Sequence, residues 1–125
     1  MFADTKAFSG FAVDDLDRAR DFYAETLGIR TTTEDMGFLT LHIAGDRPTL
    51  VYPKPDYTPA TYTILNFPVD DVDAAVGELS SRGVEFLRYD GFEQDEQGIS
   101  RAEGGPPIAW FTDPAGNILA VLETD

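Results

Sequence analysis

The sequence predicts an α+β fold built from two βαβββ modules, and three observations lead to this prediction. The segment FAVDDLDRA at residues 11–19 recurs as FPVDDVDAA at residues 67–75. In both copies an alternating apolar stretch precedes the Asp pair and a helical pattern follows it. Strand-like stretches separated by turn residues then complete each half. Two copies of such a unit indicate a duplicated module, because a solenoid needs more repeats.

In the first half, Phe11 and Val13 alternate as in a strand with one packed face. Asp14 and Asp15 end this strand, and one of them can accept hydrogen bonds from the first turn of a helix. An apolar stripe predicts that this helix runs to the glycine at position 28, and its members are Leu16, Ala19, Phe22, Tyr23 and Leu27. Strands are expected at residues 29–34, 38–43 and 49–52, with AGDRP as the turn between the last two.

The second half repeats this order. Phe67 and Val69 predict a strand, and Asp70 and Asp71 lead into a helix that ends at Gly83. The apolar residues of this helix are Val72, Ala75, Val76 and Leu79. Strands are expected at residues 84–89, 108–112 and 117–123, with DPAGN as a tight turn. Residues 91–107 form a long loop, which is either a lid over a cavity or a solvated insertion; Arg101 and Glu103 lie at its end.

Length and composition limit the classes of function that are open to this chain. The 125 residues suffice for one domain, 1–125, with an internal repeat of 1–55 and 60–125 and KPDYTP between the halves. There is no cysteine and no apolar run long enough to cross a membrane, so we expect a soluble, cytoplasmic protein with no membrane partner. The net charge of −14 repels phosphate backbones and argues against a nucleic-acid partner.

The combination of VDDLDRARDFYAETLGI with FTDPAGNILAVLE, in two βαβββ halves, resembles the vicinal oxygen chelate superfamily. That superfamily includes glyoxalase I, bleomycin- and fosfomycin-resistance proteins and extradiol dioxygenases. The resemblance covers essentially the whole chain. It implies mixed sheets that curve into a half-open barrel around a ligand cavity, with the helices outside, and it implies a homodimer.

The resemblance also indicates where a metal would bind. Metal-dependent members carry a ligand five residues before the Val of the VDD segment in each copy and a Glu three residues after the Asn of DPxGN. In this chain those positions are Phe8, Ile64 and Ala120. Their side chains have no lone pair for a divalent cation, so we predict no family-type metal centre and no cofactor.

Strand alternation then predicts which residues line the cavity. Phe11, Val13, Leu65, Phe67 and Val69 are expected to face the helices, which leaves their neighbours inward. The candidate ligand-binding residues are Phe8, Phe38, Thr40, His42, Tyr52, Ile64, Asn66, Trp110 and Ala120. This set is mostly apolar with a few polar groups, as is usual for small-molecule sites.

Each polar or aromatic candidate has a structural alternative. His42, the only histidine, is a candidate general base or hydrogen-bonding group, but a purely structural or exposed histidine is favoured because no catalytic partner is fixed near it by the sequence. Asn66 either orients a ligand or bonds within the sheet. Trp110 and Tyr52 either stack on a flat ligand or belong to the core or a dimer interface.

Two functions remain open. The first is a metal-free protein of the bleomycin-resistance type that binds an apolar or aromatic small molecule, with a role in resistance or sequestration. The second is a glyoxalase-like lyase or isomerase that uses acid–base chemistry around His42. The sequence favours the first, because the three ligand positions lack donors and the cavity faces are apolar.

Overall fold

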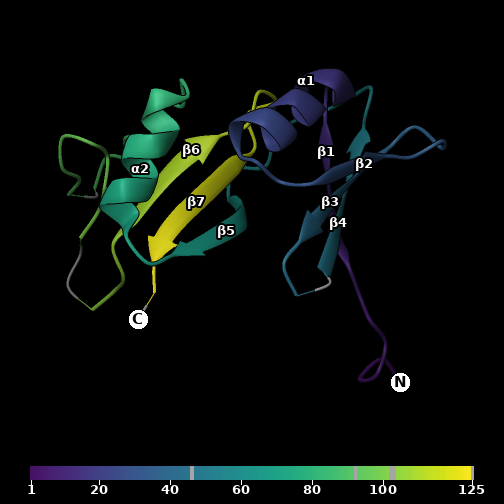
Figure 1. The fold of residues 1–125 in the computed structure, drawn as a ribbon, viewed down its shortest axis with the longest axis horizontal. Helices are drawn as coiled ribbons and strands as arrows, with labels where there is room; N and C mark the ends of the chain where they lie inside the picture. The colour runs from purple at the N-terminus through teal and green to yellow at the C-terminus, as the bar shows by residue number, and fades with distance from the viewer. Residues whose placement is uncertain (46, 92, 102–103, 125) are drawn as a thin grey trace. The chain divides into compact units, whose positions relative to one another are not determined.

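The computed structural model describes residues 1–45, 47–91, 93–101 and 104–124. The chain divides into two compact units, Met1–Thr58 and Pro59–Asp125, and the boundary falls inside the KPDYTP segment. Each unit contains one mixed sheet and one helical segment, so the α+β prediction is confirmed (Figure 1). None of the helices in the described ranges has the length and apolar character needed to cross a bilayer.

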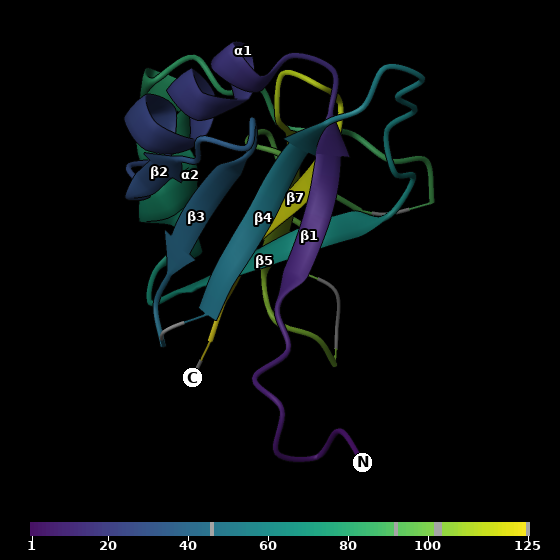
Figure 2. The ribbon, with the colours of Figure 1, turned by 90° about the vertical axis from the view of Figure 1, so that its right-hand side faces the viewer.

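The first unit has a four-stranded sheet in the order β1-β4-β3-β2 (Figure 2). Its strands are β1 (Ser9–Val13), β2 (Thr31–Thr33), β3 (Leu39–Ile43) and β4 (Arg47–Pro53). The β1–β4 pair is parallel and the other pairs are antiparallel. The parallel pair requires a crossover, and the helical segment after β1 begins it.

The helical segment of this unit differs from a continuous helix. Helix α1 (Leu16–Asp21) changes at Phe22 into a π-helical turn, η1 (Phe22–Thr26), in which the N–H of Leu27 donates to the carbonyl of Phe22 at 3.0 Å. Nothing in the sequence pattern predicts this change. The buried Tyr23 ring packs against Phe11 of β1, with ring centroids 5.7 Å apart, so Phe11 faces the helix as predicted.

Strand β4 corrects one predicted turn. Arg47 and Pro48 were expected in the AGDRP turn, but they pair with Ile43 and His42 and belong to β4. Proline is tolerated there because β1 begins only at Ser9, opposite Thr49. Pro48 therefore has a strand neighbour on one side only, and its missing N–H leaves no ladder bond to β1 unmade.

The second unit has a three-stranded sheet in the order β5-β7-β6. Its elements are β5 (Thr63–Val69), α2 (Val72–Ser81), β6 (Ile108–Thr112) and β7 (Ile118–Glu123). Strands β5 and β7 are parallel, and β6 and β7 are antiparallel, as in the corresponding pairs of the first unit. In Figure 1, α2 lies against this sheet.

The two helices begin in the same way. Asp15 and Asp71 have extended backbones, and each side chain accepts a hydrogen bond from the N–H three residues later, at 3.2 and 3.1 Å. The second Asp of each DD pair is therefore the N-cap, a choice between the two that the sequence left open. Helix α2 gains a second acceptor, because Glu123 Oε1 accepts the N–H of Val72 at 3.0 Å.

The strand predicted at residues 84–89 is wrong. Within the described residues this stretch makes one bridge, between Phe86 and Phe111 of β6, and the N–H of Leu87 donates to the Trp110 carbonyl. The Gln94 side chain occupies the neighbouring backbone groups: its Oε1 accepts from Tyr89 N at 2.8 Å and its Nε2 donates to Leu87 O at 2.9 Å. A side chain thus replaces the continued strand ladder.

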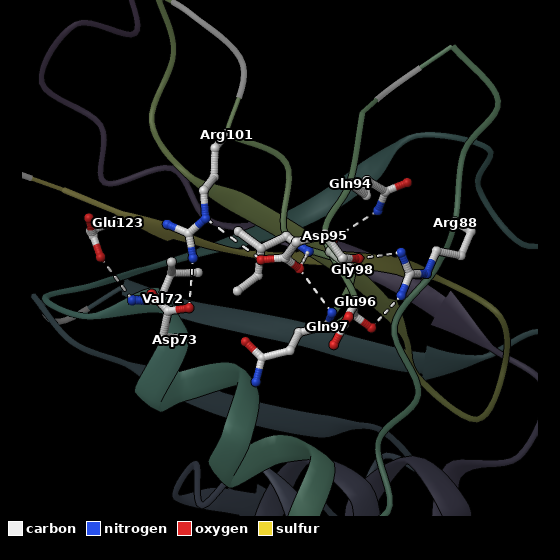
Figure 3. A network of polar contacts seen from close by, with 11 residues as sticks. Val72, Asp73, Arg88, Gln94, Asp95, Glu96, Gln97, Gly98, Arg101 and Glu123 are labelled. Carbon is white, nitrogen blue, oxygen red and sulfur yellow. Dashed lines mark hydrogen bonds and ion pairs between the residues drawn. The ribbon is translucent and has the colours of Figure 1, made fainter.

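The long loop is attached to its own unit, as Figure 3 shows. Ser100 bridges Ile108 at the outer edge of β6, and Ile99 is buried. Asp95 Oδ1 accepts the N–H groups of Gln97 and Ile99, both at 2.9 Å. Within the described part, residues 94–101 are held against the sheet and α2 rather than projecting as a separate insertion.

Arg101 joins this loop to the start of α2. Its Nη2 lies 2.6 Å from Asp73 Oδ1, and its Nε lies 3.6 Å from Asp95 Oδ2. The hydrogen bond to Asp73 raises the pKa of Arg101. Burial raises the pKa of Asp95, but the N–H groups of Ile99 and Gln97 and the Arg101 charge outweigh it, so that this pKa lies below its ordinary value.

Candidate functional site

Each sheet has one face toward its helix and one face away from it. In the first unit Phe11, Val51 and Leu39 share the helical face in register, and Val51 and Leu39 are fully buried. Alternation places a second set on the other face, which we call the first non-helical face: Gly10, Ala12, Thr32, Thr40, His42, Leu50 and Tyr52. None of these side chains is fully buried, and Tyr52 is 39% exposed.

A hydroxyl group lies beside His42 on this face. Its Nε2 lies 2.6 Å from Thr32 Oγ1, and both residues are exposed. The sequence did not select Thr32, because three consecutive threonines at 31–33 give no period-two signal. This contact joins the candidate general base to a hydroxyl group.

The second unit has a corresponding face. Glu123 caps α2, so Leu119, Val121 and Glu123 lie on the helical side of β7. The second non-helical face consists of Asn66, Pro68, Ile108, Trp110, Ala120 and Leu122. Asn66, Ala120 and Trp110 form one row across the three strands, and the Trp110 ring meets Tyr89 edge to face at 5.3 Å.

The three positions at which the resemblance expects metal ligands carry no donor atom. Phe8 lies just before β1 and is 66% exposed. Ile64 is an extra residue in β5, because Thr63 pairs with Ile118 while Leu65 pairs with the adjacent Leu119. Ala120 is 0% exposed. A methyl, a phenyl and a butyl group do not fit the expected metal, and the described residues contain no cluster of three acidic, histidine or cysteine side chains suited to one.

Phe38 and Glu103 complete the set of residues that the sequence singled out. Phe38 precedes β3 and is half-buried, and its carbonyl accepts the N–H of Glu34. Glu103, expected at the end of the loop, lies outside the described residues. A separate open hollow of about 570 Å³ lies beside the end of β7 and is lined by residues that sequence reasoning did not select: Gly104, Gly105, Pro106, Pro107, Leu122, Glu123 and Thr124.

The turn before β7 positions Ala120. Asp113 and Asn117 are buried; Asp113 Oδ1 accepts the N–H of Ala115 and of Asn117, and Oδ2 accepts Asn117 Nδ2 at 3.0 Å. Gly116 has φ +92°, which favours glycine. The DPAGN segment is thus a self-bonded turn that fixes where β7 starts.

One protein family matches most of this chain. The family model described as Glyoxalase/Bleomycin resistance protein/Dioxygenase superfamily matches residues 7–121. A search of curated proteins found no match. TnmS3, an antibiotic binding protein from Streptomyces sp. CB03234, is 27% identical with a TM-score of 0.68, and the alignment covers 95% of this chain and 96% of that one.

Two further solved structures are similar. A glyoxalase/bleomycin resistance protein from the same Streptomyces strain is 27% identical, with a TM-score of 0.61 and coverage of 93% and 99%. A superfamily member from Sphaerobacter thermophilus DSM 20745 is 24% identical, with a TM-score of 0.71 and coverage of 94% and 97%. This last likeness supports the fold alone.

Proposed function

Since the chain belongs to the Glyoxalase/Bleomycin resistance protein/Dioxygenase superfamily, we propose that it is a metal-free member that binds an apolar or aromatic small molecule without converting it. One observation carries the proposal: Phe8, Ile64 and Ala120 occupy the three ligand positions and offer no donor atom. A divalent cation needs converging oxygen or nitrogen donors, and these side chains supply none.

The character of the two non-helical faces supports binding of an apolar ligand. Leu50, Tyr52, Trp110 and Leu122 contribute large apolar surfaces, and the polar groups among them are few. Small-molecule sites have this composition. The antibiotic-binding protein at 27% identity supports the same class of activity, with sequestration or resistance as the role.

Two measurements test this proposal. Elemental analysis of protein purified without chelators is expected to find no stoichiometric zinc, nickel, iron or manganese. Thermal unfolding with 2-acetylnaphthalene is expected to show stabilisation, because a ligand at about 100 times its Kd adds ~2.7 kcal/mol. Near-stoichiometric metal, or no shift with aromatic probes, would overturn the proposal.

The second candidate is a glyoxalase-like lyase or isomerase, which the Thr32–His42 contact favours. Its test uses the hemithioacetal of methylglyoxal and glutathione and follows thioester formation. Turnover that is lost in His42→Ala, with the fold and aromatic binding retained, would establish the enzyme. Absence of turnover in both proteins supports the binding function.

We also propose that the protein is a cytoplasmic homodimer. The homodimer rests on the family resemblance, and light scattering tests it. A mass near the 13.7 kDa of one chain at working concentration would refute the dimer.

A further inference from the structure

The first non-helical face is divided into two stripes of different chemistry. On β1 and β4 the stripe is apolar: Gly10 pairs with Leu50, and Ala12 pairs with Tyr52. A Cβ at Gly10 would lie 3.3 Å from Leu50 Cβ and from the Leu50 carbonyl, so the glycine permits close packing there. The result is an apolar stripe that ends at the exposed Tyr52.

The neighbouring strands β3 and β2 carry the polar stripe. Thr40 lies opposite Leu50 on one side and opposite Thr32 on the other, and Thr32 bonds to His42. The chain thus changes from aliphatic to hydroxyl and imidazole groups between β4 and β3. A ligand with one polar edge matches this boundary better than a ligand that is apolar throughout.

The Thr32–His42 pair offers a donor in each protonation arrangement. If the hydroxyl donates to Nε2, the neutral ring carries its hydrogen on Nδ1 and can donate from there. If Nε2 donates to Oγ1, the Thr32 hydroxyl hydrogen is free to donate instead. In the imidazolium form both groups can donate. Each arrangement therefore leaves a hydrogen, on Nδ1 or on the Thr32 hydroxyl, for an oxygen acceptor placed on that side of the pair.

The spacing between strands gives the distance that a ligand would span from the apolar to the polar stripe. From β4 to β2 is two strand spacings, roughly 10 Å. A fused two-ring system with one oxygen substituent has about that span. Its rings would contact Leu50 and Tyr52, and aromatic rings pair favourably with a tyrosine face.

We propose that the first non-helical face binds a planar aromatic molecule that carries an oxygen acceptor at one edge. The ring system lies over Leu50 and Tyr52, and the oxygen accepts a hydrogen bond from the Thr32–His42 pair. This inference rests on the proposed function and adds the orientation and the polar group of the ligand. It assigns Thr32 and His42 to specificity rather than to acid–base chemistry.

The test compares two probes of nearly equal shape, 2-acetylnaphthalene and 2-isopropenylnaphthalene, which differ by C=O in place of C=CH2. Each is titrated into ¹⁵N-labelled full-length protein and followed by amide chemical shifts. We expect shifts centred on β2, β3 and β4, and about three- to tenfold tighter binding of the ketone, the ratio that one neutral hydrogen bond supplies.

Variants assign that preference to the pair. The double variant Thr32→Val/His42→Leu removes both donors and is expected to bring the ketone preference close to unity, whereas each single variant leaves one donor of the pair. Thr32→Ser keeps the hydroxyl and is expected to retain the preference. Thr33→Val is the matched control, because Thr33 is exposed on the same strand but points to the other face.

The outcomes separate this inference from the proposed function. Equal affinities of the two probes for the natural protein would overturn the inference and leave the proposed function standing. A ketone preference that survives in the double variant Thr32→Val/His42→Leu would also overturn it, as would shifts confined to other strands. If these strands shift on dilution without probe, a second copy covers the face and the inference is wrong. Failure of both probes to bind would overturn both.

Discussion

Replacing Ala120 by glutamate restores the residue type that metal-dependent relatives are expected to carry there, and the structure predicts a large loss of stability. Ala120 is 0% exposed and lies in register between Asn66 and Trp110. No Lys, Arg or His occupies these neighbouring positions, so an introduced carboxylate has no positive partner in its row. Desolvation would raise its pKa by several units.

The magnitude follows from linkage. An unfolded-state glutamate titrates near pH 4.3, and a buried one can remain neutral above pH 7. Keeping the proton at pH 7 then costs about 1.4 kcal/mol for each of 2.7 pH units, or about 4 kcal/mol. Overpacking adds roughly 1–3 kcal/mol. Because the folded pKa is raised, the electrostatic cost falls as the pH is lowered and is about 1 kcal/mol at pH 5.

Urea unfolding of Ala120→Glu and Ala120→Gln between pH 5 and 7 measures this cost. The glutamine variant has nearly the same volume and no charge, so it carries the overpacking without the pH dependence. Ala74→Glu, on the exposed side of α2, is the surface control and is expected to change stability little. A glutamate variant within 1 kcal/mol of the glutamine variant at pH 7 would refute the reasoning, since the introduced carboxyl would then be solvated or bound to metal.

Three further predictions follow from local geometry. Asp15→Ala and Asp71→Ala are each expected to lower the unfolding free energy by about 1 kcal/mol in urea titrations, because each removes an N-cap; equal stability would contradict the capping role. Gly77→Ala is expected to stabilise by up to about 1 kcal/mol, since a Cβ there meets nothing within 4 Å, whereas Gly116→Ala is expected to destabilise because of its φ of +92° and its approach to Pro59. Asp95 has a lowered pKa in the folded state, so its stabilising contribution is present near neutrality and is lost as the pH falls through that value; Asp95→Asn is expected to flatten the acid limb of the stability profile, and an unchanged limb would contradict this.

Local sequence patterns correctly predicted the elements that occur in both copies of the repeat. The strand before each Asp pair, the caps at Asp15 and Asp71, and the DPAGN turn all depend on residues that are close in sequence. Their chemistry can be read without knowledge of the tertiary structure. The same holds for the face assignment of Phe11, which the contact with Tyr23 confirms.

The errors arose where distant residues compete for backbone groups. Residues 84–89 have a strand-like composition, but Gln94 supplies the hydrogen bonds that a longer strand would take. Similarly, the extent of β4 depends on where β1 begins, which places Pro48 outside the two-sided part of the sheet. Thr32 was missed because its importance comes from a partner ten residues away.

A comparison of the two copies of the repeat distinguishes positions that the fold requires from positions on the faces proposed to bind a ligand. Positions that match between them, such as Asp15 with Asp71 and Phe11 with Phe67, serve as caps or face the helix. Gly10 and Ala12, on the non-helical face, correspond at the same offset to Asn66 and Pro68, which share neither shape nor polarity with them. The helical faces thus keep one chemistry in both units, whereas the non-helical faces have diverged from each other. A ligand that suits the Thr32–His42 pair on the first face therefore finds no matching pair among Asn66, Ala120 and Trp110 on the second.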